Sequence, residues 1–556
     1  MRTTSISERT EETVAAQASA GNLVQAKRSN THLHVILILL AGVLARIPFY
    51  LAFRPIWSGD SPGYAAPYAM WTYHVFGNGE RTPVYPLFLG LVQWLAMVTP
   101  KAELDIRAAY IAILTQSILN IIGAVLFYFS LRSLRIRATI AFGSSLFLAT
   151  ISGVCSFEMN ILNMSLSFFL LVLAAFLFLR AMNGFKEGRG NTLLATATGF
   201  ALALAVLNRP DMLIFVVLLL TITACMRPKS QSTSDLQSAA RPLKAATWIG
   251  IPVAFAVIVW MCLMYVAIGE FRITTLDGWN RSRTVYNMFD SVDEEDRAIG
   301  VIMSRTYRQQ VDTGADVNIR EIMWQAQNDL YSNYARYPIV DPNNYHSPLG
   351  QKAIRITHDI LGLVEVRCEG GILNNYCWEG IRVKINTGDY LGRVSSKLAR
   401  RYPKDWVANI VGNFVQESFN FSYMEPKSAV AGFKSISPDG REAAMNEGAA
   451  RLTIATNRVH APLLLLTYLI TLCYFALSPL VLFRKQDEHW LHDAVVTSLA
   501  IASVGTIIGT CVLAGYNRAY SLPHLVIFVI CTAYAWANRS RIVAAVSARL
   551  HWTLSV

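Results

Sequence analysis

Long apolar runs separated by short polar stretches dominate the hydropathy pattern of this chain. A helix that crosses the hydrocarbon core of a bilayer needs about 20 mostly apolar residues. The pattern therefore predicts an all-α, polytopic membrane protein with about ten transmembrane helices. The ten apolar segments are 33–53, 108–131, 139–157, 161–181, 192–208, 211–226, 246–268, 461–483, 493–514 and 523–537.

Two apolar stretches do not fit a simple span. The stretch 192–226 is too long for one helix, and Asn208-Arg209-Pro210-Asp211 interrupts it. Proline and three polar residues at that point predict a turn between two short helices. The stretch 84–98 is short and contains Pro86 and Gln93, so we expect an interfacial or re-entrant helix there.

The distribution of basic residues sets the expected topology. If 84–98 does not span, the loops on one side of the membrane hold 19 Lys and Arg, against 6 in the short loops on the other side. The positive-inside rule makes the richer side cytoplasmic. Asp60, Glu80, Arg81, Arg209 and Arg518 are then expected on the outer face, and so is Glu158.

The pattern divides the chain into five parts. We expect a disordered cytoplasmic tail (1–32) and a cytoplasmic C-terminal tail (538–556). Between them lie a transmembrane core (33–268) whose first outer loop is 54–83, a mostly helical extracytoplasmic domain (269–460) inserted before the last three helices, and those helices (461–537). In the inserted domain, 397–421 is predicted to be an amphipathic helix broken at Pro403, on the membrane or over the site.

Composition agrees with a membrane protein. Hydrophobic residues make up 53% of the chain and charged residues 15%, whereas soluble domains carry about 25% charged residues. The net charge of +12 follows from the basic cytoplasmic loops, so it does not indicate nucleic-acid binding. The sequence also has no zinc-type Cys/His spacing, Walker A motif or dinucleotide fingerprint.

Cysteine usage is consistent with this sidedness. Six of the eight cysteines lie in apolar segments, and the other two, Cys368 and Cys377, lie in the expected outer domain. A pair of this kind in an oxidising compartment predicts a disulfide, with two free thiols as the alternative.

The first outer loop has the residues of a candidate active site. Ser58-Gly59-Asp60-Ser61-Pro62-Gly63-Tyr64 is followed by Gly79-Glu80-Arg81-Thr82-Pro83-Val84-Tyr85-Pro86. One carboxylate can take a proton, and a carboxylate with a guanidinium can hold a phosphate or a metal. Charged loops between membrane helices are common, so the rest of the chain has to supply the context.

That context resembles the GT-C superfamily of membrane glycosyltransferases, in particular the branch of protein mannosyltransferases and aminoarabinose transferases. Asp60 follows the first span, and Glu80-Arg81 precedes the Pro-Val-Tyr-Pro element. Glu158-Met159-Asn160-Ile161-Leu162 resembles the acid-x-x-Ile-Leu element of the superfamily. Further along, Arg209-Pro210 lies between short spans, and Arg518 opens the last one. The chain departs from the family where Ser61 and Asn163-Met164 replace second acids.

The resemblance implies transfer of a sugar from a polyprenyl-phosphate carrier to a saccharide, lipid or protein acceptor, with inversion. Asp60 is then the general base for the acceptor hydroxyl. Arg81, Arg209 and Arg518 are candidate ligands of the donor phosphate, because guanidinium matches phosphate oxygens bidentately. The alternative for each Arg is snorkelling toward lipid headgroups.

Four further residues could support the site, and two of them, Glu80 and His74, could bind a metal. Glu80 orients Arg81 or holds a divalent cation, and His74 is its candidate metal partner. Glu158 serves the site or pairs with a nearby Arg, and Arg46 in the first span is either structural or faces the site. No cofactor is certain: the two missing acids weaken the case for a divalent metal, which needs several oxygen ligands.

Two rival functions remain open from the sequence. One is a transporter or flippase of a lipid-linked sugar, although the charges cluster at outer helix ends and not at the midplane. The other is an oligosaccharide polymerase or ligase. The expected location is the bacterial inner membrane, with the site on the extracytoplasmic face. Mannose, arabinose, aminoarabinose and uronic acids all remain open as the sugar.

Overall fold

The fold was analysed in a computed structural model of the 556-residue chain. The structure describes residues 31–56, 61, 63–65, 81–98, 104–186, 191–226, 236–297, 300, 303–304, 378–418, 447–482, 490–514 and 521–541. Of the expected N-terminal tail (1–32), residues 1–30 lie outside these ranges and residues 31–32 begin the first helix. Outside them too lie Asp60, His74, Glu80, Arg518, Cys368 and Cys377.

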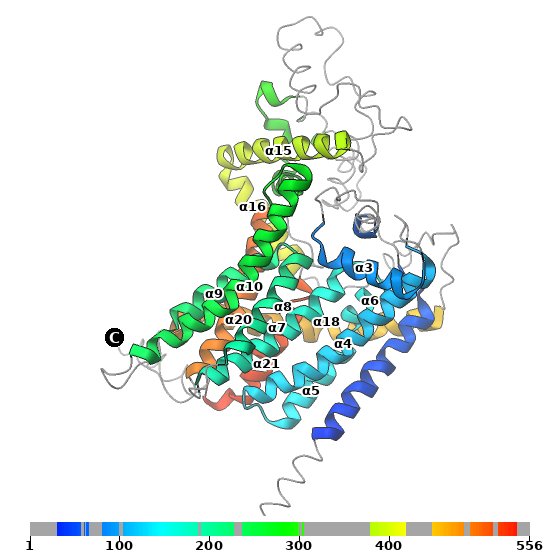
Figure 1. Ribbon diagram of the computed structural model, residues 1–556, viewed down its shortest axis with the longest axis vertical. Helices are drawn as coiled ribbons and strands as arrows, with labels where there is room; N and C mark the ends of the chain where they lie inside the picture. The colour runs from blue at the N-terminus through cyan, green and yellow to red at the C-terminus, as the bar shows by residue number, and fades with distance from the viewer. Residues whose placement is uncertain are drawn as a thin grey trace, which may run out of the picture.

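The described chain is a bundle of helices (Figure 1). The first helix, Thr31–Ala52, carries no label in the figure. The other described helices of the membrane part are α3 (Val84–Leu95), α4 (Ile106–Ser133), α5 (Ala138–Thr150), α6 (Ser152–Glu158), α7 (Asn163–Lys186), α8 (Thr192–Asn208), α9 (Met212–Cys225), α10 (Leu236–Ile268), α18 (Glu447–Ala476), α19 (Ser478–Leu482), α20 (Trp490–Ala514) and α21 (Leu525–Ala537).

These helices confirm an all-α polytopic membrane protein. Six described helices are long and apolar enough to cross a membrane, and the bent pair α5–α6 makes a seventh. The shorter apolar helices α8, α9 and α21 complete the ten predicted segments. Helix α3 has 12 residues, which corresponds to a length of about 18 Å at 1.5 Å per residue. By length α3 belongs with the shorter apolar helices, so an interfacial or re-entrant position of 84–98 stays a prediction.

The segment 139–157 differs from the single straight span that its hydropathy predicts. It consists of α5 and α6, which meet at an angle of 41°. Ile151 between them has φ −55° and ψ 118°, outside the helical region. Ser152-Gly153 follows at once, and such pairs are a recognised cause of helix kinks. Hydropathy does not reveal the break because both halves are apolar.

Helix ends follow local sequence signals. Asp105 accepts a hydrogen bond from the Arg107 N–H at the start of α4 (2.8 Å), and Asn191 caps α8 in the same way. The predicted break at Pro403 is confirmed: α15 (Trp378–Arg401) ends two residues before it, and α16 (Pro403–Ser418) begins at the proline. Proline suits a first helical position because no partner is needed for an N–H there.

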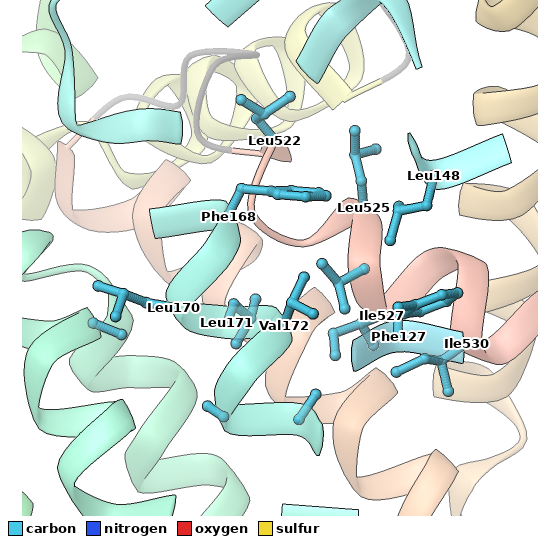
Figure 2. Packing of buried hydrophobic residues seen from close by; sticks show 14 of the residues in the cluster. Phe127, Leu148, Phe168, Leu170, Leu171, Val172, Leu522, Leu525, Ile527 and Ile530 are labelled. Carbon is cyan, nitrogen blue, oxygen red and sulfur yellow. The ribbon is translucent and has the colours of Figure 1, made fainter. Parts of the chain in front are cut away.

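The core of the bundle is formed by helices far apart in sequence. Figure 2 shows Phe127 of α4, Leu148 of α5 and Phe168 of α7 packed around the start of α21. All three side chains are almost completely buried, as are Leu525 and Ile527 of α21. The C-terminal helix therefore lies inside the bundle, against α4, α5 and α7.

Part of the inserted domain is described, and it is helical. Helix α15 crosses the end of the long helix α10 (Figure 1), where Ile385 packs with Trp260, Met264 and Ile268. A second small core forms around Trp279 of α11 (Asp277–Ser282). Three short 3-10 turns, Arg283–Val285, Phe289–Ser291 and Glu294–Asp296, follow α11.

Glycines set the contact between α11 and α15. A Cβ placed on Gly278 would lie 1.6 Å from the carbonyl oxygen of Gly388, and one on Gly388 would lie 2.7 Å from Trp279 Nε1. Only glycine lets two backbones approach this closely. Nearby, Arg272 makes a bidentate ion pair with Asp389 (2.8 and 3.0 Å), which ties the chain leaving α10 to α15.

Candidate active site

The candidate site is organised around the junction segment, residues 158–164, which connects the end of α6 to the start of α7. The Ile56 N–H donates to the Met159 carbonyl (2.8 Å), and the Ile161 N–H donates to the Ile56 carbonyl (3.0 Å). This is a short parallel bridge between Ile56 and Asn160. It fixes the chain that leaves the first helix against the end of the broken helix.

Ser61, the residue after Asp60, is hydrogen-bonded to the junction segment. Ser61 is fully buried, and its hydroxyl donates to the Ile161 carbonyl (2.9 Å). Asp60 lies outside the described residues, but it is bonded to Ser61. Ser61, which stands in place of a second acid, therefore has a structural role: it anchors its part of the chain to the junction segment.

Arg81 lies against the same loop. Its guanidinium carbon is 4.4 Å from the centroid of the Tyr64 ring, a cation–π geometry, and its Nη1 lies 3.3 Å from the Tyr64 hydroxyl. Gly63 makes room for it: a Cβ there would be 3.2 Å from Arg81 Nε. The structure thus brings Arg81 together with Tyr64, which lies four residues after Asp60 in the sequence.

A chain of contacts connects this arginine to the junction segment. The Tyr64 ring meets the Tyr85 ring edge-on at 5.1 Å. The buried Tyr85 hydroxyl donates to Gln116 Oε1 (3.1 Å), and Gln116 Nε2 donates to the Glu158 carbonyl (2.9 Å). Tyr85 belongs to the Pro-Val-Tyr-Pro element, so this element positions the loop against α4.

Glu158 forms a buried ion pair with Arg46 of the first helix. The guanidinium meets the carboxylate through two nitrogens, Nε (2.7 Å) and Nη2 (2.5 Å). Ser117 and Asn120 of α4 donate to the same carboxylate at 2.8 and 2.9 Å. Both charged side chains are almost fully buried. Of the two roles left open for Glu158, the geometry is that of pairing with an arginine.

This geometry bears on the question of a divalent metal. A carboxylate that accepts four hydrogen bonds, two of them from a cation, has its oxygens already satisfied. In the ranges that the structure describes, no group of three or more His, Cys, Asp or Glu side chains is placed to hold a metal ion. The described residues therefore do not fit a metal site; Glu80 and His74 lie outside them.

Arg209 is the second described arginine of the site. It occupies the turn between α8 and α9, is almost fully buried, and makes a bidentate ion pair with Asp211 (3.0 and 2.5 Å). Its Nη1 contacts the Met164 sulfur. A phosphate bound here would have to share the guanidinium with Asp211.

The turn that carries Arg209 is clamped to the start of α7. The Asn163 side chain donates to the Asn208 carbonyl (2.7 Å), and the Asn208 side chain donates to the Asn163 carbonyl (2.9 Å). Asn208 also donates to Ser167 (2.6 Å). Asn163 and Met164, which take the place of a second acid in the motif that the sequence resembles, thus both contact the turn of Arg209.

Sequence reasoning missed several residues of this site, above all Gln116, Ser117 and Asn120. A signal for them was present: three polar side chains fall on one face of an otherwise apolar helix. Polar residues inside a membrane helix are expensive and point to the bundle interior. Their partners were not predictable, because these lie on helices far away in sequence.

Comparisons with known proteins add a likeness in fold. No protein-family model matches the chain, and no curated protein sequence matches it. Among solved structures, an oligosaccharyltransferase of Archaeoglobus fulgidus in the apo form aligns with 94% of this chain and 52% of its own, at 9% identity and a TM-score of 0.39. The AglB oligosaccharyltransferase of that organism, in complex with an inhibitory peptide and a dolichol-phosphate, aligns with 95% of this chain and 52% of its own, at 11% identity and a TM-score of 0.40.

A second kind of protein is also similar. ArnT of Cupriavidus metallidurans bound to undecaprenyl phosphate aligns with 89% of this chain and 77% of its own, at 12% identity and a TM-score of 0.31. The chain spans about half the length of the oligosaccharyltransferases. At these scores the likeness concerns the course of the chain and extends to no donor or acceptor.

Proposed function

We propose that this protein is an integral-membrane glycosyltransferase that moves a sugar from a polyprenyl-phosphate carrier to an acceptor hydroxyl, with inversion. One observation carries the proposal. Ser61, Arg81 and the Arg209 turn all connect to the junction segment, Ser61 directly, Arg81 through Tyr64–Tyr85–Gln116 and the turn through Asn163. Two cations and the residue that follows the candidate base in sequence thus connect to one short stretch of backbone.

The proposed reaction is a single displacement. The acceptor oxygen attacks the anomeric carbon, its proton passes to the Asp60 carboxylate, and the bond to the polyprenyl phosphate breaks. Arg81 and Arg209, with Arg518, stabilise the charge that develops on the leaving phosphate. Such electrostatic stabilisation is often the largest single contribution to catalysis. Glu80 is assigned to orienting Arg81.

Glu158 has no chemical step in this proposal. Its carboxylate accepts hydrogen bonds from Arg46, Ser117 and Asn120, and it holds the end of α6 in place. The base must then come from another acid. Asp60 is assigned to this role because the next residue, Ser61, is anchored to the junction segment, at the end of the bundle where α3 and α6 lie close to the end of the first helix (Figure 1).

The basic asymmetry of the loops supports an extracytoplasmic position for this end, in a bacterial inner membrane. The donor would then present its headgroup at that face while its isoprenoid tail stays in the lipid. The acceptor is a saccharide, lipid or protein that reaches the same face.

The test is a transfer assay with purified protein in liposomes. A panel of radiolabelled polyprenyl-phosphate sugars, covering hexoses, pentoses and uronic acids, is supplied, and transfer or hydrolysis of the label is scored. We expect release of label from the lipid carrier with at least one donor. Vectorial movement of intact donor across the bilayer without cleavage would instead identify a transporter.

A further inference from the structure

The break between α5 and α6 is stabilised by side chains of two other helices. In a continuous helix the Ser152 N–H would donate to the carbonyl four residues earlier. Ile151 leaves the helical region and interrupts this pattern. Broken backbone at membrane depth is costly unless its polar groups find partners inside the protein. The groups at this break do find partners, and they come from two other helices.

One side of the break is held by the first helix. Arg46 Nη1 donates to the Ala149 carbonyl at the end of α5 (2.9 Å). The same guanidinium makes the ion pair with Glu158 at the end of α6. Arg46 therefore bridges the last turn of α5 and the last residue of α6.

The other side is held by α18. The Ser152 N–H donates to His460 Nδ1 (3.1 Å), and the Ser152 hydroxyl donates to Asn457 Oδ1 (3.1 Å). Asn457 and His460 are three residues apart and so lie on one face of the helix. An Nδ1 that accepts this N–H requires a neutral ring with its proton on Nε2. The Phe147 ring packs edge-on against the imidazole at 5.6 Å.

We propose that His460, assisted by Asn457, is a positioning residue for the candidate active site. It caps the orphaned N–H at the start of α6, and α6 leads after two turns into the junction segment. Loss of this cap lets α6 shift and moves the segment to which the Asp60 loop, through Ser61, is anchored. The effect on turnover rests on the proposed function, whereas the hold on α6 does not.

Cys155, within α6, can report whether α6 is held in place. Cys155 lies three residues after Ser152 and is fully buried next to the Arg46–Glu158 pair. A membrane-permeant maleimide should label it slowly in the folded protein and faster when α6 loosens. Mass spectrometry of the Cys155 peptide measures this rate without any sugar donor.

The experiment compares three variants of the full chain with wild type. His460→Ala removes the acceptor. His460→Asn keeps one, because the amide oxygen can take the place of Nδ1. Val459→Ala is the control, since that side chain is 63% exposed on the same helix. Each is tested for Cys155 labelling and for kcat and KM toward the donor that wild type uses.

We expect His460→Ala to speed Cys155 labelling and to lower kcat, each by about tenfold, the worth of one buried hydrogen bond. The KM for the donor should stay unchanged, and His460→Asn should restore both readouts. If His460→Ala cannot be recovered folded, Asn457→Ala must show the same two changes to a smaller degree.

Wild-type labelling and kcat in His460→Ala would overturn the proposal. Equal impairment of His460→Asn and His460→Ala would also overturn it, because the effect would then come from packing of the imidazole ring and not from its Nδ1 acceptor. If wild type transfers no sugar from any donor, the proposed function fails, but Cys155 labelling still decides whether His460 holds α6.

Discussion

The Arg46 guanidinium and the Glu158 carboxylate lie 2.5 Å apart inside the bundle, joined across 112 positions of sequence. Ser117 and Asn120 complete the coordination of the carboxylate. This pair fixes the end of the broken helix, and through it the junction segment to which the candidate loops are attached. An intramembrane acid next to a site motif can thus serve the architecture of the site.

Glu158→Gln tests whether this carboxylate stabilises the fold through its ion pair with Arg46 or takes part in the chemistry. The amide oxygen can still accept from Asn120, and the amide NH2 can donate to the Ser117 hydroxyl, but the Arg46 charge is left without its counter-charge in an apolar interior. Breaking a buried pair in this way costs about 3–5 kcal/mol. We expect a clear drop in the midpoint of thermal unfolding of the detergent-solubilised protein.

The matched variant is the double substitution Arg46→Met with Glu158→Gln, which removes both charges and keeps the acceptor. It should recover part of the lost stability, because the unpaired charge is gone but the Ala149 carbonyl also loses its Arg46 donor. A Glu158→Gln protein that unfolds like wild type but has lost turnover would contradict the structural role and assign Glu158 to the chemistry.

The glycine contact between α11 and α15 gives a test of the outer domain. Gly278→Ala would put a methyl group 1.6 Å from the Gly388 carbonyl, so the helices must separate. Overpacking of this kind costs about 1–3 kcal/mol or more. Limited proteolysis should cut the variant faster than wild type near α11 and α15.

Gly412→Ala is the control for that experiment. Nothing lies within 4 Å of a Cβ at this position of α16. Alanine is favoured over glycine in a helix by about 1 kcal/mol, so the control should be at least as resistant as wild type. Equal sensitivity of the two variants would show that α11 and α15 are not packed through their glycines.

Much of the fold was predictable because it depends on local sequence. Apolar runs of sufficient length specify spans, and Pro403 specifies a helix start. The turn at Arg209-Pro210 between α8 and α9 was likewise visible as polar residues inside a long apolar stretch. In contrast, the kink at Ile151 contains no proline and leaves hydropathy unchanged, so the pattern predicted one span across it.

The candidate site was predictable only in part. The sequence shows Asp60, Arg81 and Arg209 near helix ends, and topology predicts one face for them. It does not show that Asn163 clamps Asn208 or that Ser61 reaches Ile161, because these contacts depend on how helices pack. The sequence left open whether Glu158 pairs with an arginine; helix packing supplies Arg46 as the partner.

Arg81 is predicted to serve the donor in both its bound and leaving states. Arg81→Ala should therefore lower donor affinity and turnover together. Arg81→Lys should retain only part of both, because lysine keeps the charge but lacks the planar fork of the guanidinium. Gly63→Ala provides a subtler change. Its methyl group would lie 3.2 Å from Arg81 Nε and displace the guanidinium with its charge intact.

Gly63→Ala should lower turnover by less than Arg81→Ala and leave the unfolding midpoint near wild type. Gly143→Ala on α5, where a Cβ would meet nothing within 4 Å, is the control and should behave as wild type. Donor binding and turnover that stay unchanged in Arg81→Ala would remove Arg81 from the site.

The most direct test of the account is sugar transfer by Asp60→Asn in proteoliposomes, measured beside binding of the same labelled donor. The amide keeps the size of the carboxylate but cannot accept the proton of the acceptor hydroxyl. General-base catalysis is typically worth about 10²–10⁴-fold. The account predicts a loss of transfer of that order with donor binding close to wild type. Transfer at the wild-type rate, or weakened donor binding with unchanged turnover of bound donor, would contradict it.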